Sequence, residues 1–110
     1  MSFKIIPSEK FKKEAKRLAK KYKSLKQELV ELNAVLQRNP EFGTPLSNNT
    51  FKIRLGVKSK GKGKRAGVRI ITYSVTVSQE VYLLTIYDKS EFDSIDDRML
   101  KTIIQRLSFD

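Results

Sequence analysis

The spacing of apolar residues changes midway along the chain, and this change limits the possible folds more than any other feature of the sequence. Over residues 9–38, apolar side chains recur at the three-to-four-residue spacing of an amphipathic helix. From residue 51 onward they alternate with polar side chains, as in a half-buried β-strand. Helices followed by consecutive strands predict an α+β domain in which helices cover one face of an antiparallel-rich sheet.

The first part of the chain predicts one strand and two helices. The apolar run Phe3–Ile6, stopped by a proline, is typical of a short strand. Ser8 is a suitable N-cap for a helix over Glu9–Tyr22. Ser24 and Gln27 have the spacing of a capping box for a second helix, which an Asn-Pro pair ends. The two helices should therefore form an αα-hairpin.

The second part predicts three strands and a final helix. Residues 39–49, which contain two prolines and a glycine, are expected to be a loop. The strands are expected over Phe51–Val57, Gly67–Val77 and Val81–Tyr87; the last is apolar on both faces and should be central. A helical stripe capped by Ser94 follows. The order is β-α-α-β-β-β-α, and the length of 110 residues suits a single domain over residues 1–110.

Composition restricts the chemistry available to the chain. The absence of cysteine and histidine excludes disulfides, thiolate nucleophiles, imidazole catalysis and zinc sites with nitrogen or sulfur ligands. No sequence motif indicates a cofactor, and none is expected. A net charge of +11, concentrated in the first two thirds, favours polyanionic partners. Neither a membrane-spanning run nor a signal-peptide pattern is recognisable, which predicts a cytoplasmic protein.

A lysine- and glycine-rich stretch joins two of the expected strands. Its composition alone fits a flexible linker, but neighbouring strands rarely need so long a connection. Glycines let backbone N–H groups approach an anion and lysines add charge, so a phosphate-binding loop accounts for both residue types. The expected phosphate contacts there are Lys58, Lys60, Lys62, Lys64 and Arg65. On the first helix, Lys16 and Lys20 belong to a basic face that is either solvated or contacts phosphate.

Further polar residues lie around this stretch. Lys52 and Arg54 should project from one strand beside Arg69 of the next. By strict alternation, Arg69 would point to the more apolar face of its strand. Either it therefore lies at the very start of the strand, or a bulge after the preceding glycine turns its side chain to the other face. Lys89 and Glu91, where the central strand ends, could donate or accept a proton.

These segments, in this order, resemble the RelE/ParE superfamily of bacterial toxins, and most closely its HigB-like branch. The matching segments are Phe51–Leu55, Lys58–Lys64, Gly67–Tyr73 and Tyr82–Glu91. The resemblance implies a microbial RNase-like (RelE-like) fold and a metal-independent mRNA endonuclease, a hydrolase or mRNA interferase that acts in the ribosomal 30S A site and inhibits translation. It also implies a cognate antitoxin, often a helix-turn-helix DNA-binding protein, in a toxin–antitoxin hetero-oligomer.

By the same resemblance, residues matching Lys52, Arg54, Arg69 and Lys89 bind RNA and stabilise the reacting phosphate. Ser90 stands where the RelE pattern has an arginine, and the C-terminal catalytic tyrosine of that pattern has no clear counterpart. The general base is left open among the lysines and Glu91, and Tyr73 or Tyr87 could stack on a base or donate a proton. Two other functions also remain open: inhibition of DNA gyrase, as in ParE, and RNA binding without catalysis.

Overall fold

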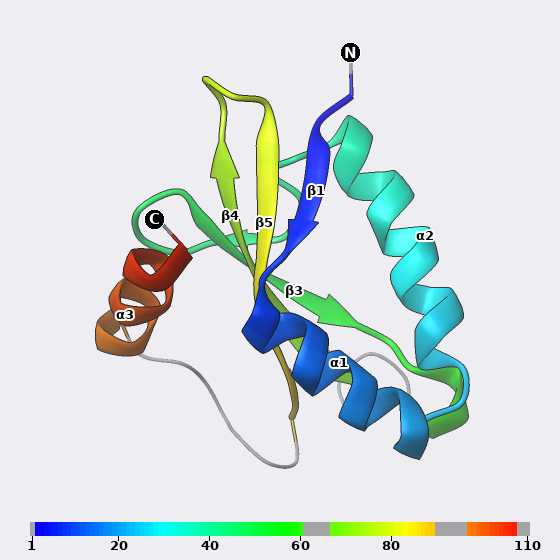
Figure 1. The fold of residues 1–110 in the computed structure, drawn as a ribbon. Coiled ribbons are helices and arrows are strands. Elements are labelled where there is room, and N and C mark those ends of the chain that lie inside the picture. Colours follow the sequence, from blue (N-terminus) through cyan, green and yellow to red (C-terminus); the bar gives the residue numbers. More distant parts are fainter. Residues whose placement is uncertain (1, 61–66, 90–96, 108–110) are drawn as a thin grey trace.

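The computed structural model describes residues 2–60, 67–89 and 97–107 (Figure 1). The elements follow the expected order, with one short strand and one 3-10 turn added. In chain order they are β1 (Lys4–Pro7), α1 (Glu9–Lys21), α2 (Leu25–Arg38), β2 (Thr44–Pro45), β3 (Thr50–Leu55), η1 (Lys58–Lys60), β4 (Val68–Val75), β5 (Glu80–Asp88) and α3 (Asp97–Leu107). No helix among these residues is long and apolar enough to cross a bilayer.

The five strands form one sheet in the order β1-β5-β4-β3-β2. Strands β2 to β5 pair antiparallel, whereas β1 pairs parallel with β5. The expected central place of β5 is confirmed, because it lies between β1 and β4. Residues 39–49 were expected to be a loop throughout, and this is wrong for β2: Gly43 turns the chain with a φ of +115°, and the next two residues reach the edge of β3.

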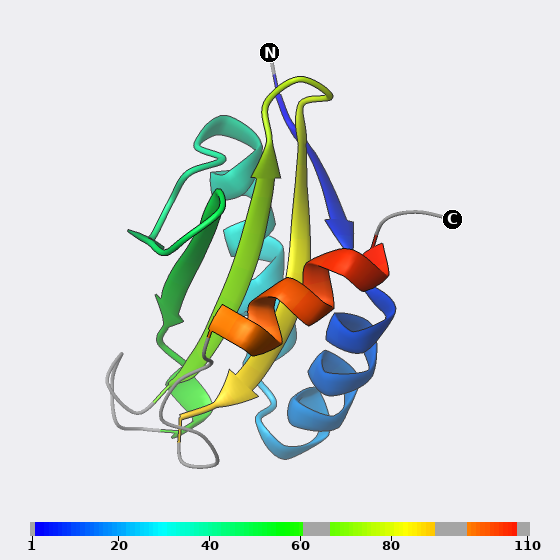
Figure 2. The ribbon, with the colours of Figure 1, turned by 90° about the vertical axis from the view of Figure 1, so that its left-hand side faces the viewer.

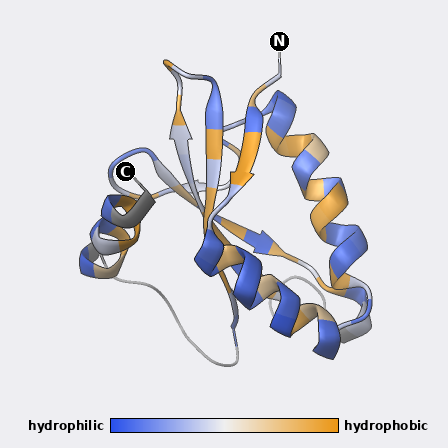
Figure 3. Ribbon diagram, viewed as in Figure 1, coloured by the Kyte–Doolittle hydropathy of each residue, from blue (hydrophilic) through white to orange (hydrophobic). Residues whose placement is uncertain are grey.

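Helices cover both faces of the sheet, not one face as the order of elements had suggested (Figures 1 and 2). Helices α1 and α2 pack on one face around Leu18, Leu36 and Ile70. Helix α3 packs on the other, where Leu100 joins Leu84 of β5. The reason is that β5 is apolar on both faces, so each face needs a cover. Figure 3 shows apolar and polar residues alternating along α1 and α2, as this arrangement requires.

The two expected N-caps differ in outcome. Ser8 caps α1 as predicted, because its Oγ accepts a hydrogen bond from the Phe11 N–H at 3.0 Å. Ser24 precedes α2, but it has helical dihedrals and makes no capping bond, so the predicted capping box is wrong. Its hydroxyl is engaged instead by Ser59, far along the chain. The cap expected at Ser94 lies outside the described residues.

The last residue of β5 is a buried acid that is tied to the end of α1. Asp88 is fully buried, and its Oδ2 accepts a hydrogen bond from the Tyr22 hydroxyl at 2.6 Å. The Lys21 ammonium lies 3.9 Å from the same oxygen. These contacts hold the end of β5, and with it the following Lys89, against the helical hairpin.

Replacing Tyr22 with phenylalanine should therefore destabilise the fold. The substitution keeps the ring but removes one hydrogen bond from a buried carboxylate, which costs about 1–3 kcal/mol in the free energy of unfolding. Urea denaturation followed by circular dichroism measures the loss. Tyr82→Phe is the control, because its hydroxyl binds Glu80 near the exposed β4–β5 turn. Equal losses in the two variants would contradict a special role for the Asp88 contact.

Candidate nucleic-acid interface

Three cations lie together on the sheet face that α3 partly covers. In the β3–β4 register, Arg54 is directly opposite Arg69, and Lys52 is opposite Ile71. Directly opposed residues of antiparallel strands project to the same face, and Ile71 belongs to the cluster that packs on α3. The expected convergence of these residues is thus observed. We call Lys52, Arg54 and Arg69 the cationic face.

Arg69 is the most buried member of the cationic face, with 3% of its surface exposed. Its Nη1 donates to the Val68 carbonyl at 3.3 Å, and its neighbours across the sheet are Arg54 and Tyr87. Burial lowers the pKa of Arg69, Arg54 lowers it further, and Tyr87 opposes the shift. An arginine remains charged despite such a shift, so the protein holds a desolvated positive charge at this position.

The parity of Arg69 is explained by its place near the start of β4. It is the second residue of the strand, and regular alternation continues from it to Ile71. The bulge lies farther along, between Ile71 and Thr72, where β5 contributes the extra residue Leu84. The predicted bulge just after Gly67 is therefore wrong, and the alternative of a position near the strand mouth is correct.

Lys52 has a pKa below that of an ordinary lysine. Partial burial is the main cause, followed by the positive charges of Arg54, Arg69 and Lys89. The influence of Lys89 places the end of β5 within electrostatic reach of the cationic face. A lowered pKa increases the neutral fraction of Lys52 near neutral pH, and only a neutral amine can accept a proton.

Tyr87 lies across the sheet from Arg69 and is almost fully buried. Burial raises the pKa of its phenol, and the positive charge of Arg69 partly offsets the rise. The phenol is therefore neutral at physiological pH and keeps its proton. Tyr73, the other expected tyrosine, lies four residues along β4 from Arg69, with its ring centroid 6.3 Å from that of Tyr82.

The remaining expected site residues are distributed over several parts of the molecule. Lys89 is exposed just after β5, and Lys58 is exposed in η1. Lys16 and Lys20 are exposed on α1, which packs on the opposite face of the sheet from the cationic face. For Lys60 only the backbone is described. The others, Lys62, Lys64, Arg65 and Glu91, lie outside the described residues.

Sequence reasoning missed three polar residues that join distant parts of the chain. Asp88 holds the end of β5, while Glu28 and Ser59 tie η1 to α2. No local pattern points to them, because each contact joins residues at least 30 positions apart. The buried Glu28 interrupts an otherwise apolar helix face, which was the one available signal.

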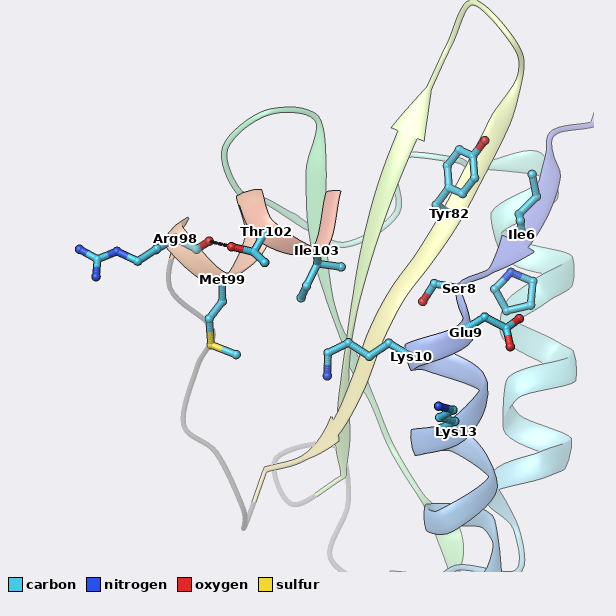
Figure 4. A pocket seen from close by; sticks show the side chains of 11 residues that line it. Ile6, Ser8, Glu9, Lys10, Lys13, Tyr82, Arg98, Met99, Thr102 and Ile103 are labelled. Carbon is cyan, nitrogen blue, oxygen red and sulfur yellow. Dashed lines mark hydrogen bonds between the residues drawn. The ribbon is translucent and has the colours of Figure 1, made fainter. Parts of the chain in front are cut away.

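One hollow in the described part of the chain is separate from the cationic face (Figure 4). It measures about 910 Å³ and lies between the start of α1 and α3. Tyr82 and Ile103 contribute to its walls, and Lys13 and Arg98 to its charge. A second hollow of about 560 Å³, between α2 and β3, includes Arg54. In the described chain, no group of three or more acidic side chains could hold a metal ion.

Gly67 allows the strands that carry the cationic face to approach closely. A Cβ atom at Gly67 would lie 2.0 Å from the Leu55 carbonyl oxygen, a backbone atom that cannot rotate away. Gly67→Ala should therefore push the start of β4 away from β3 and lower the free energy of unfolding by about 1–3 kcal/mol. Thermal melting measures this loss. Ala34→Gly, at an exposed position of α2, is the control, and it should cost only the difference in helix propensity. An unchanged melting temperature would contradict the close approach.

Comparison with known protein families found no family model that matches the chain. Among solved structures, it is similar to a double arginine-to-alanine mutant of the E. coli toxin RelE in the free state. The two share 14% sequence identity with a TM-score of 0.64, over 98% of this chain and all of that one. This agreement confirms, at the level of the fold, the resemblance seen in the sequence. The chain therefore has the RelE fold.

Proposed function

We propose that this protein is the toxin of a toxin–antitoxin system and cleaves mRNA on the ribosome in the cytoplasm. Three observations support the proposal: the RelE fold, the net charge of +11, and above all the cationic face. Two arginines directly opposite each other, beside a lysine of lowered pKa, are suited to a phosphodiester. A purely electrostatic contact with RNA needs neither the burial of Arg69 nor the lowered pKa of Lys52.

The proposed reaction is attack of a ribose 2′-oxygen on the adjacent phosphorus. The new O2′–P bond forms as the P–O5′ bond breaks, which leaves a 2′,3′-cyclic phosphate and a 5′-hydroxyl. Lys52 is the proposed base that takes the 2′-hydroxyl proton, because its pKa is lowered. Arg54 and Arg69 stabilise the negative charge that grows on the phosphoryl oxygens. The leaving 5′-oxygen takes up a proton from solvent water, which yields the 5′-hydroxyl, and Lys89 contributes positive charge near it.

A reconstituted translation assay tests this function. Purified protein is added to ribosomes carrying a defined mRNA, with and without EDTA, and the RNA ends are mapped. Cleavage that needs the ribosome, persists in EDTA and yields 5′-hydroxyl ends is expected. Intact mRNA together with inhibited DNA supercoiling would instead indicate a gyrase inhibitor. Tight RNA binding without cleavage would indicate a non-catalytic RNA-binding module.

The proposed antitoxin partner is tested separately. A toxin with such a positive surface requires neutralisation in its own cell, and an acidic or helix-turn-helix protein encoded next to it is the proposed partner. Co-expression with that neighbouring gene should restore growth, and the two proteins should co-purify as a hetero-oligomer. Growth arrest that the neighbour does not relieve would contradict this pairing.

A further inference from the structure

Glu28 is a buried acid whose hydrogen bonds reach beyond its own helix. It is 7% exposed near the start of α2, and its Oε2 accepts a hydrogen bond from the backbone N–H of Lys58 at 2.8 Å. Its Oε1 accepts one from the Ser24 hydroxyl at 3.2 Å. Burying a carboxylate is costly, and an apolar side chain would fill the same space without that cost. Packing of α2 therefore does not account for this acid.

Ser24 and Ser59 are joined by a reciprocal set of contacts. The Ser59 N–H donates to the Ser24 Oγ at 2.9 Å, and the Ser24 N–H donates to the Ser59 Oγ at 3.2 Å. The two hydroxyl oxygens lie 2.8 Å apart. A serine before a helix usually caps it, which contributes about 1 kcal/mol, yet Ser24 makes no capping bond. Its hydroxyl instead holds a residue 35 positions away.

These contacts act at one place in the chain. The turn Lys58–Lys60 leads from β3, which carries Lys52 and Arg54, into the lysine-rich residues that follow. Both backbone N–H groups at the start of this turn, those of Lys58 and Ser59, are bound to side chains of the α1–α2 connection and α2. The contacts therefore fix the backbone of the turn at Lys58 and Ser59.

We propose that Ser24, Glu28 and Ser59 form a clamp that fixes the turn Lys58–Lys60 after β3 and thereby holds the exposed Lys58 in place for RNA binding. The inference rests on the proposed function and adds positioning residues to it. Fixing this turn before RNA arrives reduces the conformational freedom that binding must remove, so the clamp should increase affinity. None of the three side chains takes part in the chemical step, so loss of the clamp should leave the turnover rate unchanged.

Substitutions at Glu28 separate positioning from fold stability. Glu28→Leu fills the space but accepts no hydrogen bond, whereas Glu28→Gln retains an acceptor oxygen. The control Glu31→Gln makes the same charge change as Glu28→Gln at an exposed position one turn from the clamp. We expect KM for ribosome-bound mRNA to rise about tenfold in Glu28→Leu, about threefold in Glu28→Gln and less than twofold in the control. Turnover should change less than twofold, and the melting temperature of Glu28→Leu should not fall.

Trypsin provides a readout that does not depend on RNA. Cleavage after Lys58, followed by mass spectrometry, should be about tenfold faster in Glu28→Leu and in Ser59→Ala than in the wild type or the control. The effects of Ser24→Ala and Ser59→Ala should add only in part in the double variant, because both remove the contact between the two hydroxyl groups.

The outcomes distinguish this inference from the proposed function. Equal trypsin rates in Glu28→Leu and the control, or an equal KM, would overturn the clamp. So would a Glu28→Leu variant that loses turnover while keeping its KM. A wild-type protein that does not cleave ribosome-bound mRNA would overturn the proposed function, and the trypsin rates would still decide whether the clamp holds the turn.

Discussion

Replacing Arg69 with alanine should reduce the rate of mRNA cleavage by about 100- to 1,000-fold. The reason is that Arg69 supplies a buried positive charge, and one such preorganised group contributes about that much to a reaction in which negative charge develops. The loss should appear in the turnover number measured on ribosome-bound mRNA. The cleavage rate of Arg69→Lys should lie between those of the wild type and Arg69→Ala, because lysine keeps the charge but lacks the planar, bidentate guanidinium group.

Two controls isolate the role of this residue. Arg38→Ala removes an exposed arginine at the end of α2, so it makes the same charge change away from the cationic face. It should keep cleavage within about threefold, as a surface charge contributes mainly screened attraction. Circular dichroism of Arg69→Ala should show an intact fold. Equal losses in the two alanine variants would refute a specific role for Arg69 in the reaction.

The pH dependence of cleavage should report the lowered pKa of Lys52. A base acts in its deprotonated form, so the rate should rise with pH until the pKa of Lys52 is passed and then become constant. Because burial and neighbouring cations lower this pKa, the rise should be complete at a lower pH than an ordinary lysine, with a pKa of about 10.4, would give. Lys52→Ala should lose about 100- to 10,000-fold in rate and the rising limb with it.

A substitution at Arg54 tests the cause of that shift. The positive charge of Arg54 is one of the causes that lower the pKa of Lys52. Arg54→Gln should therefore raise this pKa and move the rising limb to higher pH, whatever happens to the maximal rate. Single-turnover rates measured on ribosome-bound mRNA, over the pH range in which the ribosome is stable, reveal the movement. A limb that stays in place would assign the base to another residue.

Much of the cationic face followed from local periodicity. Alternation along β3 put Lys52 and Arg54 on the same face, because residues two apart in a strand point the same way. The apolar residues on both faces of β5 predicted its central place. Such features depend on near neighbours in the chain, and the sequence displays those neighbours directly.

The features that were missed all depend on contacts between distant segments. The bulge at Ile71/Thr72 arises from the pairing of β4 with β5, and neither strand shows it alone. Ser24 was expected to cap α2, but the competing partner Ser59 is provided by a turn far along the chain. Helix α3 lies on the opposite face from the hairpin because of packing against β5, which periodicity does not specify.

The parallel pairing of β1 with β5 has a consequence for how the protein forms during synthesis. Residues 4–7 are made early, but their hydrogen-bonding partners are residues 80–83. A growing chain must therefore wait for most of its length before the sheet can close, and contacts of such long sequence separation form slowly. Since Arg69 is paired with Tyr87 of that late strand, the sheet around the cationic face is incomplete until β5 has been made. The sheet therefore closes only in the last part of synthesis, and the helices that pack on it gain their full support at that stage.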